Sequence, residues 1–115
     1  MNVHNYSTSG GKDLIFDYLD KLPNKEKANG FAIIYRLEKE GLEALSYLNT
    51  RQLKSKLWEI KFYDKNRLMY IVADEENIYL LHVCKKQKGK AEKFELETAI
   101  KRAKEAEKIT GKIFI

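Results

Sequence analysis

The side chains that could carry chemistry are basic, acidic and aromatic residues in the second half of the chain. Glu59 and Lys61 alternate along one short apolar segment, Arg67 opens the next, and Lys85 and Lys86 close a third. Arginine can grip phosphate oxygens through two N–H groups at once, and lysine supplies a mobile positive charge. The pattern indicates either a surface for a phosphate-bearing polymer or a solvated sheet face with cross-strand Glu–Lys pairs.

Positive charge concentrates in the same half of the chain. The formal net charge is +5 at pH 7; residues 1–50 hold six Lys and Arg against seven Asp and Glu, whereas residues 51–115 hold sixteen against ten. The excess lies in two windows, Arg51–Arg67 and Cys84–Lys93. If folding joins these windows, they would attract a polyanion with an affinity that falls as salt rises. Lysine runs are often plain solvated surface, so charge alone leaves nucleic-acid binding open.

Metal binding and cysteine chemistry have little support in the sequence. The only imidazole or thiol ligands are His4, His82 and Cys84, and no CxxC or HExxH spacing occurs. His82 and Cys84 alternate along one segment and should point the same way, but two ligands make a weak site. A single cysteine excludes a disulfide framework and is more typical of a small packed hydrophobe. We therefore expect no metal and no cofactor.

The length and composition bound the architecture and the compartment. A chain of 115 residues that is 43% hydrophobic has the size of one domain, so we expect a single domain over residues 1–115. No uncharged apolar stretch approaches the roughly 20 residues of a membrane-spanning helix. The N-terminus lacks the pattern of a signal peptide, and the single cysteine suits a reducing compartment. We expect a cytoplasmic protein without a membrane partner.

Helical spacing and turn residues define the elements that must position these side chains. Apolar residues recur at helical spacing from Leu14 to Leu22, where Pro23 ends the helix, and again from Lys25 to Glu40, where Gly41 fits the C-terminal cap. The further elements that we expect are a short first strand at Val3–Tyr6 and a last helix at Glu92–Lys108. The tail over residues 108–115 fits a strand or a loop.

Three segments rich in aromatic and β-favouring residues predict an antiparallel meander, namely Leu57–Tyr63, Leu68–Ala73 and Ile78–Cys84. In the first segment Trp58, Ile60 and Phe62 alternate with Glu59, Lys61 and Tyr63. We expect the first set to face the core and the second set to face solvent. The element order predicts an α+β fold with the N-terminal strand and helical hairpin packed on a small antiparallel sheet.

Three motifs in this region together resemble a known toxin family: Leu57–Lys61 (LWEIK), Arg67–Tyr70 (RLMY) and Leu80–Lys88 (LLHVCKKQK). In order and spacing they are similar to those of the HigB-like toxins, the phage-derived branch of the RelE/ParE toxin superfamily. The resemblance extends roughly from Lys12 to Glu107. It implies a compact α+β toxin whose helices cover one side of a small antiparallel sheet.

The resemblance also implies an activity and partners. Relatives typically cleave mRNA on the ribosome without a metal, and a cognate antitoxin, most often a helix-turn-helix protein in this branch, neutralises them. The fold leaves a ParE-like toxin that inhibits a DNA topoisomerase as an alternative, because both activities share it. A non-catalytic nucleic-acid-binding module is the third alternative.

Metal-free RNA cleavage requires removal of the 2′-hydroxyl proton, stabilisation of the phosphorane charge and protonation of the leaving 5′ oxygen. On the resemblance, Arg67 would stabilise the charge, and Lys85 and Lys86 would hold the flanking backbone or complete that clamp. Glu59 would be the base by its side-chain chemistry, although a lysine with a lowered pKa, Lys61 or Lys54, could replace it.

Further residues would bind the RNA rather than cleave it. Tyr63 or His82 would stack on a base or donate a proton, and the lysines nearby would contact the backbone. The general acid stays unassigned, because Phe94 and Leu96 stand where many ribonuclease relatives place a tyrosine or histidine. The RNA-binding residues that we expect are Lys54, Lys56, Tyr63, His82 and Lys88.

Overall fold

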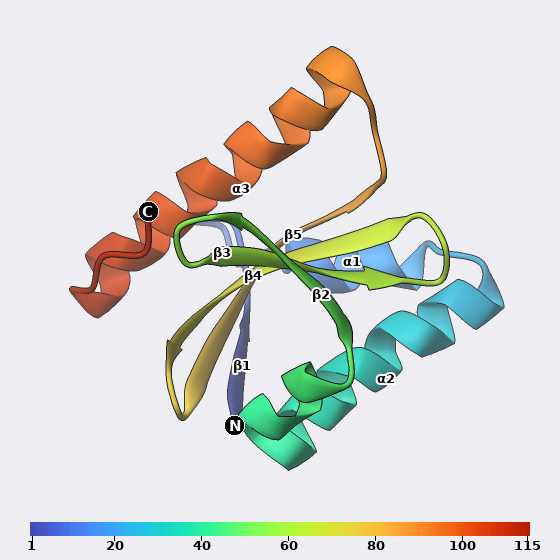
Figure 1. The fold of residues 1–115 in the computed structure, drawn as a ribbon, viewed down its shortest axis with the longest axis horizontal. Coiled ribbons are helices and arrows are strands. Elements are labelled where there is room, and N and C mark those ends of the chain that lie inside the picture. The colour runs from blue at the N-terminus through green and yellow to red at the C-terminus, as the bar shows by residue number, and fades with distance from the viewer.

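Five strands form one sheet with helices on both of its faces (Figure 1), and the computed structural model describes residues 1–115. The strands lie in the order β1-β5-β4-β3-β2. The elements are β1 (Asn2–Asn5), α1 (Leu14–Asp20), α2 (Asn24–Glu40), the short 3₁₀ helix η1 (Gly41–Ser46), β2 (Asn49–Lys54), β3 (Leu57–Phe62), β4 (Asn66–Asp74), β5 (Asn77–Lys85) and α3 (Gly89–Thr110).

The expected α+β fold and antiparallel meander are confirmed, with one strand added. Strands β2 to β5 pair antiparallel in chain order, and β1 joins the free edge of β5 in parallel. Strand β2 was missed because Asn49–Lys54 is polar and charged, with no apolar alternation to signal a strand. It forms by pairing with β3, where Arg51 lies opposite Glu59.

The core has two halves, one on each face of the sheet. Figure 1 shows the helices that cover these two faces. On one face Ile15 of α1 and Leu37 of α2 pack against residues such as Ile60 and Leu68. On the other face the alanines of α3, including Ala99 and Ala103, lie on the sheet. Small side chains let a helix approach a sheet closely, so α3 covers a face that the strand alternation alone would assign to water.

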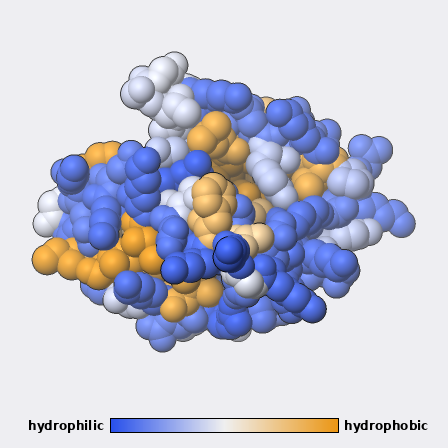
Figure 2. All heavy atoms as spheres, turned by 90° about the horizontal axis from the view of Figure 1, so that it is seen from above, coloured by the Kyte–Doolittle hydropathy of each residue, from blue (hydrophilic) through white to orange (hydrophobic).

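The layer that α3 forms on the second face of the sheet contradicts two expectations. The helices cover both sides of the sheet rather than one, and Glu59 is buried, with 3% of its side chain exposed. Lys61 is half-buried, whereas Tyr63 is exposed as expected. Figure 2, which looks down from the α3 side, shows a mostly hydrophilic surface interrupted by separate hydrophobic patches. The alternation of residues along β3 therefore correctly predicted which side chains share a face, but not which of them are exposed to solvent.

The helix ends differ from the expected limits by a few residues. Helix α1 ends at Asp20, before Leu22, and Gly41 follows α2 with a φ of 67°, a conformation that favours glycine. Helix α3 starts earlier than expected, at Gly89. The tail after it is a loop rather than a strand: Phe114 is buried, and its N–H donates to the Glu107 carboxylate at 2.7 Å.

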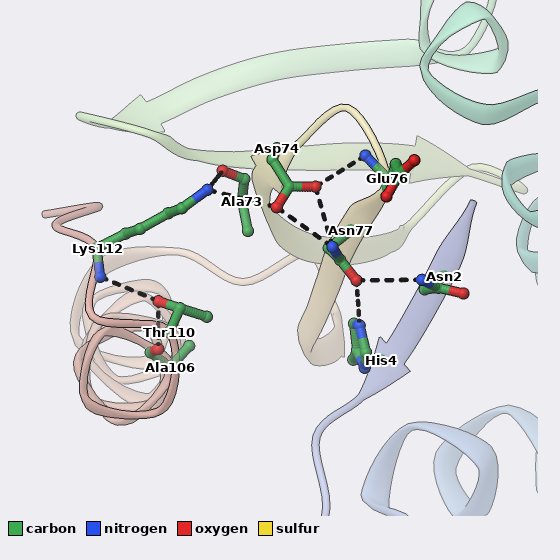
Figure 3. A network of polar contacts seen from close by, with 9 residues as sticks. All are labelled: Asn2, His4, Ala73, Asp74, Glu76, Asn77, Ala106, Thr110 and Lys112. Carbon is green, nitrogen blue, oxygen red and sulfur yellow. Dashed lines mark hydrogen bonds and ion pairs between the residues drawn. The ribbon is translucent and has the colours of Figure 1, made fainter.

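A polar network ties the β4–β5 turn to both termini (Figure 3). The Asp74 carboxylate accepts hydrogen bonds from the Glu76 N–H at 2.8 Å and from the Asn77 amide at 3.0 Å, and Lys112 forms an ion pair with it at 3.4 Å. The Asn77 carbonyl oxygen lies 2.8 Å from Nε2 of His4. These contacts hold β1 and the end of α3 against the same turn.

None of the three α-helices combines the length and the apolarity that a membrane crossing requires.

Candidate active site

A small cavity opens between the α3-side face of the sheet and the beginning of α3. Its volume is about 110 Å³, well above the roughly 10–15 Å³ that a single water molecule needs. Basic side chains outnumber acidic ones around it, and four apolar residues and Gln87 complete the lining. The charged residues that line it are Arg51, Lys61, Arg67, Lys85, Lys86, Glu59, Glu92 and Glu95.

Strand register explains why residues distant in sequence meet there. Lys61 lies opposite Arg67, and Arg67 lies opposite Cys84 across the next pair. Opposite residues of paired strands project to the same face. The register between β4 and β5 shifts between Met69 and Tyr70, and such bulges often reorient side chains beside functional sites. The sheet thus brings side chains of four strands to one face, namely Arg51 of β2, Glu59 and Lys61 of β3, Arg67 of β4 and Cys84 of β5.

Glu59 is the buried anionic centre of this site. Its Oε2 atom lies 3.1 Å from Nε of Arg51 and 3.9 Å from Nε of Arg67. A buried carboxylate is stabilised only when cations or hydrogen-bond donors compensate its charge. Two guanidinium groups supply that compensation, so Glu59 holds both arginines at the cavity.

Arg67 is anchored a second time by the turn before it. Its Nη1 donates to the carbonyl oxygens of Asp64 at 3.1 Å and Asn66 at 2.9 Å. Tyr63 and Asp64 adopt positive φ angles of 42° and 68°, which non-glycine residues rarely do. This tight turn aims the Asp64 carbonyl at the guanidinium. Arg67 is therefore fixed in place, with 11% of its side chain exposed.

The two lysines at the end of β5 diverge. Lys85 Nζ forms an ion pair with Glu26 Oε1 of α2 at 2.5 Å, on the helical-hairpin side of the sheet. The Asn66 amide donates to the same oxygen at 2.8 Å, and these bonds, the one from Lys85 first, lower the pKa of Glu26. Lys86 is exposed and forms no ion pair. The ammonium groups thus do not converge, although both residues line the cavity.

His82 lies beside the cavity in a chain of polar contacts. Its Nε2 is 2.8 Å from Glu95 Oε2, and its Nδ1 is 3.2 Å from Nη1 of Arg102. Burial lowers the pKa of His82, although Glu95 opposes the shift, while Arg102 adds to it. Burial likewise raises the pKa of the Cys84 thiol, with Glu95 as the next cause. Both groups are therefore neutral at pH 7.

The structure places a possible set of metal ligands here, because donor atoms of His82, Cys84 and Glu95 lie within 4.8 Å of one another. Arg102 argues against a metal. A guanidinium only donates hydrogen bonds, so Nδ1 of His82 must accept and Nε2 must carry the proton. That proton occupies the position a metal would need and points at Glu95. The three residues fit a hydrogen-bonded unit.

The remaining expected RNA-binding residues lie away from the cavity. Lys54 and Lys56 flank the β2–β3 turn, and Lys56 lines a separate cavity of about 560 Å³ with Trp58. Tyr63 lies in the β3–β4 turn and Lys88 just before α3, both exposed. Glu59, Lys61, Arg67, Lys85 and Lys86 are the predicted residues that line the cavity itself.

Sequence reasoning missed three residues of the site. Arg51 lies in one of the basic windows, but its role depends on the unexpected strand β2. In the sequence, Glu95 and Arg102 cannot be distinguished from ordinary charged residues of an amphipathic helix. No local pattern distinguishes them from Glu92 or Lys101, because only the docking of α3 brings them to His82.

Comparison with known protein families assigns the chain to one of them. The model of the family described as phage-derived protein Gp49-like (DUF891) matches residues 17–104. The comparison with curated proteins gave no match. The matched region begins within α1 and ends within α3, so it contains the whole cavity. Because the match spans well over half of the chain, the protein belongs to the phage-derived Gp49-like family, a family of the RelE/HigB-like toxin–antitoxin type.

Proposed function

We propose that the protein is the toxin of a type II toxin–antitoxin system and acts as a metal-independent, ribosome-associated endoribonuclease on mRNA in the cytoplasm. The observation that carries the proposal is the cavity in which Arg67, Lys61 and Lys86 surround a phosphate-sized space. The family supports a toxin, and an anchored guanidinium between two lysines supports phosphate chemistry.

In the proposed reaction the ribose 2′ oxygen attacks the adjacent phosphorus. The O2′–P bond forms and the P–O5′ bond breaks, which leaves a 2′,3′-cyclic phosphate and a free 5′ hydroxyl. Arg67 stabilises the charge of the phosphorane, because Glu59 and two backbone carbonyls hold its guanidinium ready before the substrate arrives. Lys61 and Lys86 bind the flanking phosphates.

This proposal changes the role of two residues. Glu59 serves better as the group that positions Arg51 and Arg67 than as a base, because it is buried between both guanidiniums. Lys85 serves better as a strut between β5 and α2, since its ammonium pairs with Glu26. Lys54, Lys56 and Lys88 remain candidates for contacts with more distant phosphates.

Mapping of RNA 5′ ends after induced expression tests the proposal. We expect new cuts within translated messages, and we expect Arg67→Ala and Lys86→Ala to reduce them at least tenfold. Lys104→Ala, on the exposed outer face of α3, is the matched control and should leave cutting unchanged. Circular dichroism must show that each variant is folded.

Two other outcomes would replace the proposal. Intact messages together with accumulating DNA breaks would indicate a ParE-like toxin that acts on a topoisomerase. Binding to RNA without new 5′ ends or toxicity would indicate a non-catalytic module.

We also propose a cognate antitoxin, of the helix-turn-helix type, as the main protein partner. Support comes from the family and from the positive cavity, which an acidic or shape-blocking partner could cover. Co-expression with the adjacent open reading frame should give a stable complex that no longer cleaves mRNA. Free toxin after such co-expression would argue against this partner.

A further inference from the structure

The cavity contains three carboxylates in three different environments. Glu59 is buried between two guanidiniums, and Glu92 is exposed. Glu95, in α3, differs from both: 19% of its side chain is exposed, and no lysine or arginine forms an ion pair with it. A general base needs access to substrate together with a lone pair that no cation holds. Glu59 meets neither condition. Glu92 meets both, but no hydrogen bond or ion pair of its side chain holds it in one orientation, whereas His82 orients Glu95.

The partners of Glu95 fix its orientation. Because Arg102 donates to Nδ1 of His82, the Nε2–H of His82 must donate to Oε2 of Glu95 at 2.8 Å. Arg102 is itself held by the Leu81 carbonyl at 2.9 Å and by the Tyr6 ring, 4.3 Å from its guanidinium carbon. A four-member chain from Tyr6 through Arg102 and His82 therefore ends at the Glu95 carboxylate.

We propose that Glu95 is the general base of the cavity and that His82, held by Arg102, is the residue that positions it. The inference rests on the proposed ribonuclease function. Glu95 takes the proton of the 2′ hydroxyl as the O2′–P bond forms. The leaving 5′ oxygen takes a proton from the exposed ammonium of Lys86 as the P–O5′ bond breaks. Transfer of the Glu95 proton through water to Lys86 then restores both groups.

Charged and titratable groups face Glu95 from the strands β2 to β5 and from its own helix. The groups that line the cavity with it or contact its partner His82 are Arg51 from β2, Glu59 and Lys61 from β3, Arg67 from β4, His82, Cys84 and Lys85 from β5, Lys86 just after β5, and Glu92 and Arg102 from α3.

The experiment measures single-turnover cleavage of a defined mRNA on programmed ribosomes across pH. We expect the rate of the wild-type protein to rise with pH along an acidic limb that reports Glu95. Glu95→Gln should lower the rate about 10²-fold or more and abolish that limb. Glu97→Gln, on the same helix and exposed, is the matched control and should leave rate and limb unchanged.

Variants of His82 distinguish a role in positioning Glu95 from a role in the stability of the fold alone. His82→Leu removes the N–H that donates to the Glu95 carboxylate, so the acidic limb of the rate profile should move to higher pH. His82→Gln keeps a side-chain N–H and should restore the limb toward its original position. A purely structural role of His82 would lower the amount of folded protein without moving the limb.

The outcomes distinguish this inference from the proposed function. If the wild-type protein cleaves and Glu95→Gln, shown to be folded by circular dichroism, keeps the wild-type rate or the acidic limb, Glu95 is not the base and the ribonuclease function stands. If the wild-type protein leaves the mRNA intact on the ribosome, the proposed function fails and this inference fails with it. Glu95→Asp provides a second test, because a carboxylate that still reaches the 2′ hydroxyl should retain the limb at a reduced rate.

Discussion

At the scale of residues, the site depends on a buried carboxylate whose charge two arginines compensate. Only 3% of the Glu59 side chain is exposed, and Arg51 and Arg67 form ion pairs with it. Removal of one member of a buried ion pair leaves an uncompensated charge, which costs far more than the pair contributes when intact. The same arrangement that preorganises Arg67 therefore makes the site sensitive to a change of Glu59.

We expect Glu59→Gln to lower the free energy of unfolding by about 3 kcal/mol, because Arg67 would keep its buried position without its carboxylate. Urea denaturation followed by tryptophan fluorescence of Trp58 would measure this loss. Glu97→Gln, on the surface of α3, should stay within about 0.5 kcal/mol of the wild type. Equal stability of both variants would contradict the anchoring role of Glu59.

His82 gives a pH dependence with a definite sign. Its pKa is lower in the folded protein than in the unfolded chain, so the unfolded chain binds more protons in the window below about 6.5. Folding stability contributed by neutral His82 is thus complete above that value and is lost as pH falls through the folded-state pKa. Thermal unfolding of the wild type between pH 7 and 5 should show this loss, and His82→Gln should show a shallower decline.

At the scale of elements, helix α2 approaches the sheet and α1 closely at one residue. A Cβ atom at Gly30 would lie 2.7 Å from Leu19 Cδ2 and 3.3 Å from Phe62 Cε2. Gly30 lies in the middle of α2, where glycine costs helix propensity. The close approach explains why a glycine there suits the fold. This contact sets how the hairpin carrying Glu26 meets the sheet and Lys85.

Gly30→Val should therefore destabilise the protein by about 1–3 kcal/mol through overpacking. Ala32→Val, on the same helix but away from this contact, is the control for β-branching alone. Chemical denaturation of both variants checks the difference. A Gly30→Val variant as stable as the control would mean that Leu19 can move aside without cost.

At the scale of the whole molecule, charge is distributed unevenly over the two halves of the sequence, and the sheet gathers part of that charge at one cavity. Binding of RNA to such a surface releases counterions, so the affinity falls as salt rises. The cations at the cavity should contribute to this dependence, because they line the proposed phosphate site.

Salt titration of single-stranded RNA binding would measure the effect. We expect each of Lys61→Ala and Lys86→Ala to reduce the slope of log affinity against log salt by about 1. Lys104→Ala should leave the slope unchanged. Equal slopes for all three variants would place the RNA on another face.

Part of the fold could be predicted from the spacing of residues in the sequence alone. The helical hairpin, the meander and the two faces of β3 follow from local spacing, because a strand alternates its side chains whatever it packs against. Alternation also implies that Lys85, the last residue of β5, and Lys86, which follows it, point to opposite faces. The expected clamp of both lysines with Arg67 is not formed for this reason, which the sequence already contained.

Tertiary structure alone decided the rest. Strand β2 exists through its pairing with β3, and α3 buries Glu59 and brings Glu95 and Arg102 to His82. These contacts join residues whose own neighbours in the chain carry no mark of them. Local patterns fix which face a side chain occupies, whereas the docking of a distant helix fixes whether that face meets water, a cation or another carboxylate.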